Sequence, residues 1–293
     1  MPRRLGALSL LLILALAIRP VSAAEKGSFK VEVPVDGVQL ALRVFDFVPD
    51  GSGPDTPIVF VMHGLGRDAE YYRDTWIGHA KRHGFSLVVP EFSKADFPGG
   101  ANYNRGNVMA PGDRFNREDQ WCFSLIELVF EAARRRFGSR CRHFGIYGHS
   151  AGSQFVHRLT LLTTQTSMAV GVAANAGVYT MPDFTASWPF GMRNVPDASE
   201  RLGRAFGRKL VVLLGDADDD PFHKYLDRSE GATAQGPHRF ARGGHFFARA
   251  RAEAKRMGVD FNWELDVVPG VAHSNRGMAK VAAPYIARHL NCD

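Results

Sequence analysis

Cysteine is scarce in this chain, whose 293 residues contain only Cys122, Cys141 and Cys292. Three cysteines allow at most one disulfide bond within a single chain. A helix expected over residues 119–136 would separate Cys122 from Cys141 by roughly 20 Å or more, whereas a disulfide needs Cα atoms within about 7 Å. Cys141 and Cys292 are the better pair, because both are expected where the strands of a parallel sheet begin.

The chain also lacks blocks of like charge, internal repeats and low-complexity tracts. Its formal charge of +6 falls to +3 without residues 1–24, which leaves 33 basic against 30 acidic residues. Nothing in this distribution indicates a nucleic-acid partner. Metal-ligand spacings such as H-E-x-x-H or C-x-x-C and a phosphate-binding P-loop are absent too. We therefore predict no metal site and no cofactor.

Only one long apolar run is present, over residues 5–18. It follows Arg3 and Arg4 and precedes the small residues 21–24, as in a secretory signal peptide. Its 14 residues fall short of the roughly 20 that a membrane-spanning helix needs. We expect a signal peptide at residues 1–24, a secreted or periplasmic protein, and no stable membrane anchoring after cleavage. The alternative is an uncleaved membrane anchor.

The composition, with 45% hydrophobic and 23% charged residues, is that of a globular protein. We expect one domain over residues 25–293, because this length can bury one large core. Residues 29–33 and 38–47 read as an antiparallel hairpin. Apolar strands then alternate with helices, which predicts an α/β fold whose mostly parallel sheet has helices on both faces. Strands are expected at 57–62, 85–89, 144–147, 168–174, 209–214 and 261–268, helices at 68–83, 119–136, 240–257, 275–290 and from about 153, and irregular insertions at about 91–118 and 178–208.

The pentapeptide 148–152, GHSAG, follows an apolar strand and precedes a helix. G-x-S-x-G at such a corner is typical of a nucleophile elbow, in which small residues flank a serine in a strained turn. Bulkier flanking residues would clash with the neighbouring strand and helix. Ser150 is therefore the candidate nucleophile.

Residues 63–66, HGLG, follow an earlier apolar strand. A turn of this type supplies a backbone N–H to an oxyanion hole. We expect the amides of Leu65 and Ala151 to be the donors. The alternative is a glycine-rich turn without a catalytic role.

An acid and a base are expected on two later loops. Residues 215–220, GDADDD, end the strand 209–214, and Asp218 is the favoured acid of the triad, with Asp220 second. His273 follows the last strand and is the candidate general base. The alternative for the acidic cluster is a calcium-like or merely solvated turn.

For other polar residues near these motifs, we expect a structural role rather than a catalytic one. His149 is expected to pack beside the nucleophile and His157 to be a satisfied core group. Arg239 and Arg242 either bind a substrate carboxylate or, as expected, pair with the acidic turn. Half of the aromatic side chains in the insertions and site-facing loops are expected to line an apolar cleft: Tyr71, Tyr72, Trp76, Phe92, Phe97, Tyr103, Tyr179, Trp188, Phe190, Phe246 and Phe247.

The motifs HGLG, GHSAG, GDAD and GVAH, in this order, resemble those of the α/β-hydrolase superfamily. The resemblance covers essentially everything after residue 24. Within the superfamily, residues 148–158, 175–182 and 235–243 are similar to secreted bacterial esterases of the polyhydroxybutyrate depolymerase and feruloyl esterase-like group. No separate polymer-anchoring module is visible.

This resemblance implies an α/β-hydrolase fold and a secreted serine hydrolase that cleaves carboxylic esters. The triad of Ser150, Asp218 and His273 would act through an acyl-enzyme on a small-molecule or oligomeric ester. Acyl transfer and peptide or amide cleavage by the same triad remain alternatives. A non-catalytic binding protein of the same fold is a further one.

Overall fold

The computed structural model describes residues 24–35 and 37–292. The predicted signal peptide, residues 1–24, lies outside the described residues except for Ala24. Within the described ranges, no helix combines the length and the apolar character needed to cross a membrane.

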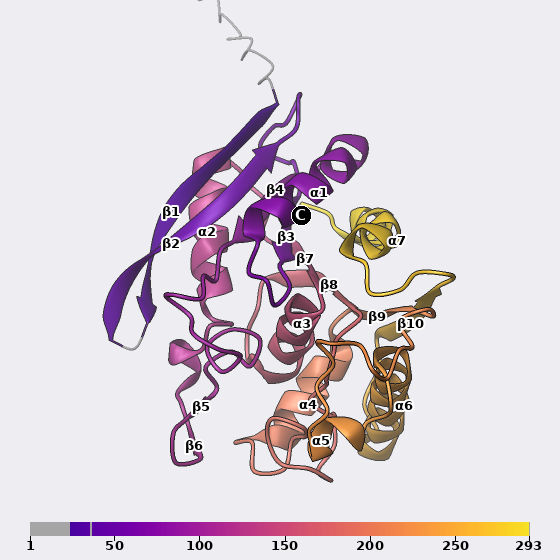
Figure 1. Cartoon of the computed structure of the whole chain (residues 1–293). Coiled ribbons are helices and arrows are strands. Elements are labelled where there is room, and N and C mark those ends of the chain that lie inside the picture. The colour runs from indigo at the N-terminus through magenta and orange to yellow at the C-terminus, as the bar shows by residue number, and fades with distance from the viewer. Residues whose placement is uncertain (1–23, 36, 293) are drawn as a thin grey trace, which may run out of the picture.

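An eight-stranded sheet forms the centre of the fold, in the order β1-β2-β4-β3-β7-β8-β9-β10 (Figure 1). β1 and β2 form an antiparallel hairpin, β2 also pairs antiparallel with β4, and every later pairing is parallel. The predicted mostly parallel sheet with an antiparallel N-terminal hairpin is confirmed. The strands are β1 (Glu25–Val35), β2 (Val38–Val48), β3 (Ile58–Met62), β4 (Ser86–Pro90), β7 (Phe144–His149), β8 (Met168–Ala174), β9 (Leu210–Gly215) and β10 (Trp263–Val268).

Helices cover both faces of this sheet (Figure 1). Along β3, alternate residues point to opposite faces, so Phe60 joins the core under α2, α3, α4 and α6, whereas Val59 and Val61 join the core under α1 and α7. The interior strands are therefore buried on both faces and mostly apolar. The helices are α1 (Ala69–His83), α2 (Leu125–Phe137), α3 (Ala151–Leu162), α4 (Ala198–Gly207), α5 (Glu230–Thr233), α6 (Arg239–Met257) and α7 (Asn275–His289).

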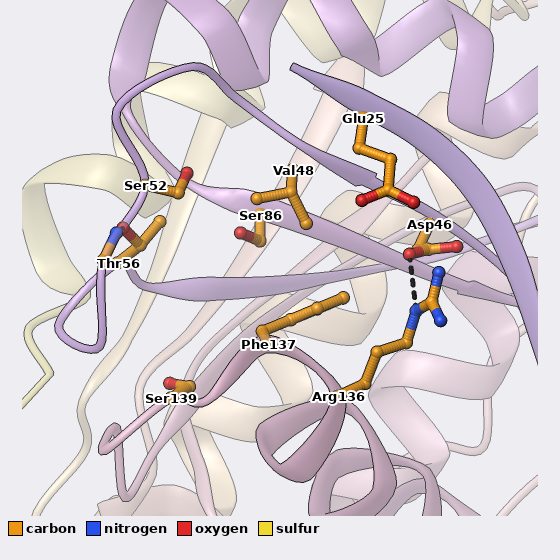
Figure 2. Close-up of a pocket in the computed structure, with 10 residues that line it drawn as sticks. Glu25, Asp46, Val48, Ser52, Thr56, Ser86, Arg136, Phe137 and Ser139 are labelled. Carbon is orange, nitrogen blue, oxygen red and sulfur yellow. Dashed lines mark hydrogen bonds and ion pairs between the residues drawn. The ribbon is translucent and has the colours of Figure 1, made fainter. Parts of the chain in front are cut away.

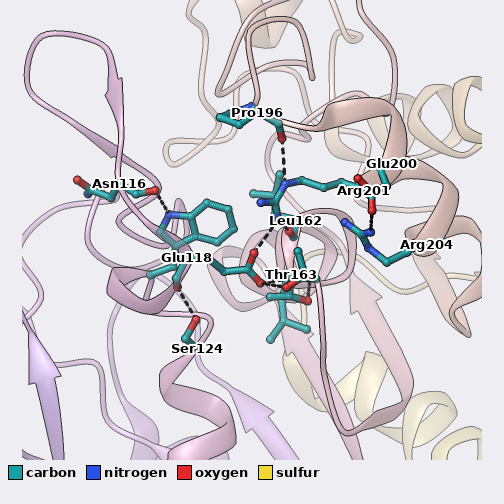
Figure 3. A network of polar contacts seen from close by, with 12 residues as sticks. Asn116, Glu118, Ser124, Leu162, Thr163, Pro196, Glu200, Arg201 and Arg204 are labelled. Carbon is teal, nitrogen blue, oxygen red and sulfur yellow. Dashed lines mark hydrogen bonds and ion pairs between the residues drawn. The ribbon is translucent and has the colours of Figure 1, made fainter.

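The helix expected from residue 119 begins later, at Leu125. A short 3-10 turn, η1 (Glu118–Gln120), precedes it, and the Trp121 indole donates to the backbone oxygen of Asn116 at 3.0 Å. The Glu118 carboxylate accepts from Arg201 Nη1 at 2.9 Å, which ties η1 to α4 (Figure 3). These side-chain contacts hold the segment in a turn although its apolar spacing is helical.

Both predicted insertions contain regular structure that the sequence analysis missed. The first carries a small hairpin of β5 (Met109–Ala110) and β6 (Arg114–Phe115). The second contains α4, whose buried face includes Leu202 and Phe206. Leu202 and Phe206 have helical spacing, but the glycines and prolines around them led us to expect an irregular segment.

A disulfide bond joins Cys141 and Cys292, whose Cα atoms lie 4.2 Å apart. The predicted pairing is confirmed. The backbone supports it, because the Arg142 amide donates to the Cys292 carbonyl oxygen at 3.3 Å. Cys122 is buried, and its thiol donates to the Asn102 carbonyl oxygen at 3.1 Å.

A small polar pocket lies where the parallel strands begin, lined in part by Ser86 and Ser139 (Figure 2). An ion pair between Arg136 Nε and Asp46 Oδ2, 3.0 Å long, crosses it. This end of the sheet is opposite to the carboxyl ends of the strands, where open α/β sheets bind their ligands. The pocket is therefore remote from Ser150.

Candidate active site

Ser150 stands at the corner between β7 and α3, as its motif predicts. Its backbone has φ 59° and ψ −117°, a strained conformation for a residue with a side chain. The Ser150 amide donates to the Ala174 carbonyl oxygen at 3.0 Å, which anchors the corner to β8. The hydroxyl is thereby held at the carboxyl edge of the sheet.

The two glycines of the motif permit this corner to close. A Cβ atom on Gly148 would lie 2.1 Å from the carbonyl oxygen of Gly152, and one on Gly152 would lie 2.1 Å from that of Met62. Both clashes involve backbone atoms that cannot move independently of β3 and α3. The steric reason given for small residues in the motif therefore holds in three dimensions.

The structure brings the three candidate triad residues together from separate loops. His273 Nε2 lies 3.0 Å from Ser150 Oγ, and His273 Nδ1 lies 2.7 Å from Asp218 Oδ2. Asp218 follows β9 and His273 follows β10, so neighbouring parallel strands deliver acid and base to one edge. Both distances are those of hydrogen bonds.

The neighbouring acids of the turn have other contacts. Asp220 Oδ1 accepts from the Phe222 amide at 2.8 Å, and Asp216 Oδ1 accepts from the Gly270 amide at 2.6 Å. Asp218 is buried, whereas Asp220 is exposed. Of the two acids considered, the structure places Asp218 against the histidine.

The two expected oxyanion donors lie in the turn after β3 and at the start of α3. A Cβ atom on Gly64, next to Leu65, would lie 3.8 Å from Ser150 Cβ. Ala151 is the first residue of α3, where backbone N–H groups have no partner within the helix. Leu65 is 51% exposed in the turn that follows β3. His63 and Arg67 fasten this turn: His63 Nε2 accepts from the Phe92 amide at 3.1 Å, and Arg67 Nη1 donates to the Phe92 carbonyl oxygen at 2.5 Å.

The chain matches no protein-family model, and no curated protein was found to be similar to it. It is 39% identical to the solved poly(aspartic acid) hydrolase-1 from Sphingomonas sp. KT-1, over 90% of this chain and 99% of that one, with a TM-score of 0.86. It is also 32% identical to LpqC, a poly(3-hydroxybutyrate) depolymerase from Bordetella parapertussis, over 89% of this chain and 88% of that one, with a TM-score of 0.83.

The chain belongs to the α/β-hydrolase family. The expected resemblance to the polyhydroxybutyrate depolymerase group is confirmed, and the protein is a hydrolase. More distant structures, such as an S-formylglutathione hydrolase from Agrobacterium tumefaciens with 15% identity and a TM-score of 0.62, share the fold.

A second histidine of this α/β-hydrolase packs against the candidate base. The rings of His149 and His273 lie 4.5 Å apart, and Tyr72 Oη lies 3.3 Å from His149 Nδ1. Burial, followed by the nearby His273 and Arg239, holds the pKa of His149 well below its usual value. His149 therefore stays neutral beside the base, as its expected packing role requires.

His157 is a satisfied core group in the hydrolase, as predicted. Its Nδ1 lies 3.0 Å from the Ser153 carbonyl oxygen, and its Nε2 accepts from the Thr180 amide at 3.1 Å. The ring connects α3 to the second insertion through these two hydrogen bonds, and it does not contact Ser150.

The two arginines assigned to the acidic turn have different partners. Arg239 Nη1 donates to Asp218 Oδ1 at 3.2 Å, inside the protein. Arg242 binds backbone oxygens instead, including that of Gly177 at 2.6 Å. The expected pairing is right for Arg239 and wrong for Arg242, because Arg242 lies almost one turn further along α6, beside the loops around residues 177 and 236.

Asn175 is a positioning residue that the sequence analysis missed. It has φ 51° at the end of β8, its Oδ1 accepts from the Gly215 amide at 2.8 Å, and its Nδ2 donates to the Ala272 carbonyl oxygen at 3.2 Å. One side chain thus joins the end of the strand before Asp218 to the residue before His273. Its place directly after an apolar strand was the available signal.

More of the aromatic side chains considered for an apolar cleft are buried than the half that was expected, although Trp188 and Phe190 line a pocket. Rings in the first insertion pack on one another, with Phe92 4.8 Å from Phe97 and 5.2 Å from Tyr103, and so form a core beneath the site. Tyr71 remains exposed. The buried members are Tyr72, Trp76, Phe92, Phe97, Tyr103, Tyr179, Trp188 and Phe246.

Proposed function

We propose that this hydrolase is an exported serine esterase in which Ser150, His273 and Asp218 form the catalytic triad. The observation that carries the proposal is the pair of contacts made by one imidazole, 3.0 Å to Ser150 Oγ and 2.7 Å to Asp218 Oδ2. The similarity to a poly(3-hydroxybutyrate) depolymerase supports an ester as the substrate.

In this mechanism Ser150 Oγ attacks the ester carbonyl carbon while His273 Nε2 takes the hydroxyl proton. The amides of Leu65 and Ala151 donate to the oxyanion. His273 then gives the proton to the departing alkoxide, and an acyl-enzyme remains. Water then attacks the acyl carbon while the same imidazole takes its proton. His273 gives this proton to Ser150 Oγ as the bond from the acyl carbon to the serine oxygen breaks, which releases the acid. Asp218 orients His273 and stabilises its charged form.

Amide hydrolysis is the second candidate function. A relative with 39% identity is a poly(aspartic acid) hydrolase, and poly(aspartic acid) is joined by amide bonds. The same triad can cleave either bond, because the acyl-enzyme formed by an ester or an amide is the same. Parallel assays with a p-nitrophenyl ester and with poly(aspartic acid) distinguish the two activities.

Export to an oxidising compartment is supported by two features. One is the basic and apolar N-terminal segment, and the other is the disulfide between Cys141 and Cys292. N-terminal sequencing of the protein recovered from the producing cell tests this, with Glu25 expected as the first residue.

Replacement of the nucleophile tests the catalytic proposal. Ser150→Ala should lower kcat for p-nitrophenyl butyrate by about 10⁴- to 10⁶-fold and abolish labelling by a fluorophosphonate probe. Ser199→Ala, which changes an exposed serine on α4, is the matched control and should retain both. Full activity of Ser150→Ala would refute the assignment. An added alcohol acceptor in the wild-type assay distinguishes transfer from hydrolysis.

A further inference from the structure

A pocket of about 420 Å³ opens beside the first turns of α3. Leu65 lines it from the oxyanion turn, Gln154 and Arg158 line it from α3, and Gly177 lines it from the loop after β8. Leu65 is itself a proposed oxyanion donor, and the Gln154 amide donates to the Ser150 carbonyl oxygen at 3.1 Å. The pocket therefore borders the proposed oxyanion hole.

Positive charge dominates the wall of this pocket. Arg105, Arg158 and Lys224 line it, and Asp227 is the single carboxylate among its lining residues. Within the described part of the chain, none of the three cations has a carboxylate within 4.0 Å. The Asp227 side chain instead accepts from the Ser229 amide at 2.9 Å.

Arg158 is the unusual member of this group, because it is only 1% exposed. Its Nε donates to Thr180 Oγ1 at 2.9 Å, and its Nη1 donates to the Asn104 carbonyl oxygen and to Gln154 Oε1. Among the described residues, its Nη2 makes no hydrogen bond. Neutral oxygens therefore fix the orientation of this guanidinium without balancing its charge.

Burial of a cation that has no anionic partner is unfavourable. The pKa of Arg158 shows this cost, since burial and then the charge of Arg105 lower it to about 9, while the more distant carboxylate of Asp227 opposes the shift only in part. An anion bound in the pocket would supply the missing partner. Charge-assisted hydrogen bonds of this kind are among the stronger polar contacts in proteins.

The position of Arg158 on α3 relates the pocket to the nucleophile. Ser150 is the N-cap of α3, so Arg158 lies eight residues along the helix, or about 12 Å at ~1.5 Å per residue. Helical side chains lean towards the N-terminus of their helix, which brings the guanidinium back towards Ser150. The hydrogen bond of Arg158 Nη1 to Gln154 Oε1, one turn nearer Ser150, shows this direction. A carboxylate bound here would lie a few bonds from the scissile carbonyl.

We propose that this pocket is a carboxylate-binding subsite, formed by Arg158 with Arg105 and Lys224, that selects substrates carrying a carboxylate a few bonds from the scissile carbonyl. The proposal rests on the esterase function proposed above. It names the substrate class as acidic esters or amides, including oligomers of acidic monomers.

The test compares two substrates of equal chain length, monomethyl adipate, which is an anion, and methyl hexanoate, which is neutral. We expect wild type to favour the anionic ester at least tenfold in kcat/KM at low salt, and this preference to shrink as salt is added. Arg105→Gln and Lys224→Gln change exposed side chains and should each lower the ratio of the two kcat/KM values about threefold or more. Arg158→Gln should remove the preference.

The matched control is Arg135→Gln, which changes an exposed arginine on α2 and should keep the wild-type ratio. If Arg105→Gln and Lys224→Gln also keep that ratio, or if wild type shows no preference, the subsite is refuted while hydrolysis of methyl hexanoate still supports the esterase. If Ser150→Ala hydrolyses both esters at the wild-type rate, the esterase proposal itself fails. Thermal unfolding of each variant establishes that the compared proteins are folded.

Discussion

At the scale of single residues, the acid of the triad shows what a sequence can and cannot specify. The sequence narrows the acid to a turn with four carboxylates, because this turn follows an apolar strand at the expected place. The G-x-x-D spacing favours Asp218, with Asp220 second, but spacing alone leaves Asp220 open, since each step along a turn points the side chain in a new direction. The choice of Asp218 depends on the partners Arg239 and His273, which come from distant parts of the chain.

Separate replacement of each candidate acid by asparagine tests this assignment. Asp218→Asn should lower kcat for p-nitrophenyl butyrate by about 10³- to 10⁴-fold, because an amide at this position favours the wrong tautomer of His273. Asp220→Asn changes an exposed side chain and should leave kcat within about twofold of wild type. A larger loss for Asp220→Asn than for Asp218→Asn would reverse the assignment. Steady-state kinetics provide the measurement.

Dependence on distant parts of the chain also explains why two positioning residues, Asn175 and His63, were not predicted. Asn175 and His63 act through backbone groups of segments that are far away in the chain, and no spacing pattern records such contacts. The glycine-flanked serine is different, because its clash partners lie within its own strand–turn–helix unit and on the adjacent β3. Local geometry is therefore predictable from the sequence, whereas contacts between loops are not.

At the scale of secondary-structure elements, the elbow depends on the close approach of β7 and α3. Gly148→Ala should strongly destabilise the protein and abolish activity, because the new methyl group would lie 2.1 Å from a backbone oxygen. Gly78→Ala, in α1, meets no atom within 4 Å and should stabilise the protein by about 0.5–1 kcal/mol. Urea unfolding measures both, and equal stability of the two variants would contradict the steric argument.

Elements were predicted best where they are buried in the sheet. The strands β3, β7 and β9 are short and buried throughout, and their largely apolar sequences predict their positions. The start of α2 was misplaced because the contacts of Glu118 and Trp121 override a helical spacing of apolar residues. The order of the strands in the sheet was not predicted, because it depends on pairings between segments that are distant in the chain.

At the scale of the whole molecule, buried histidines make stability depend on pH. Burial lowers the pKa of His63 from 6.5 to about 3 and holds those of His149 and His157 well below the usual value. Between about pH 6.5 and pH 3 the unfolded chain therefore binds more protons than the folded one. The free energy of unfolding should fall as the pH is lowered through this range, by about 1.4 kcal/mol per pH unit for each such histidine.

Urea unfolding at pH 7, 6 and 5 checks this dependence. His157→Gln removes one buried ring, so its free energy of unfolding should fall less steeply with decreasing pH than that of wild type. The control is His143→Gln, which changes a solvent-exposed ring. Equal slopes for His157→Gln and wild type would contradict the prediction.

The disulfide between Cys141 and Cys292 has a topological consequence for the whole molecule. It closes a covalent ring of the intervening chain, and Ser150, Asp218 and His273 all lie within that ring. A single proteolytic cut inside the ring leaves the segments that carry these three side chains covalently connected through the disulfide. Leu65 lies outside the ring, so the disulfide does not protect its connection in this way. As long as the sulfur–sulfur bond is intact, a singly nicked ring remains one molecule.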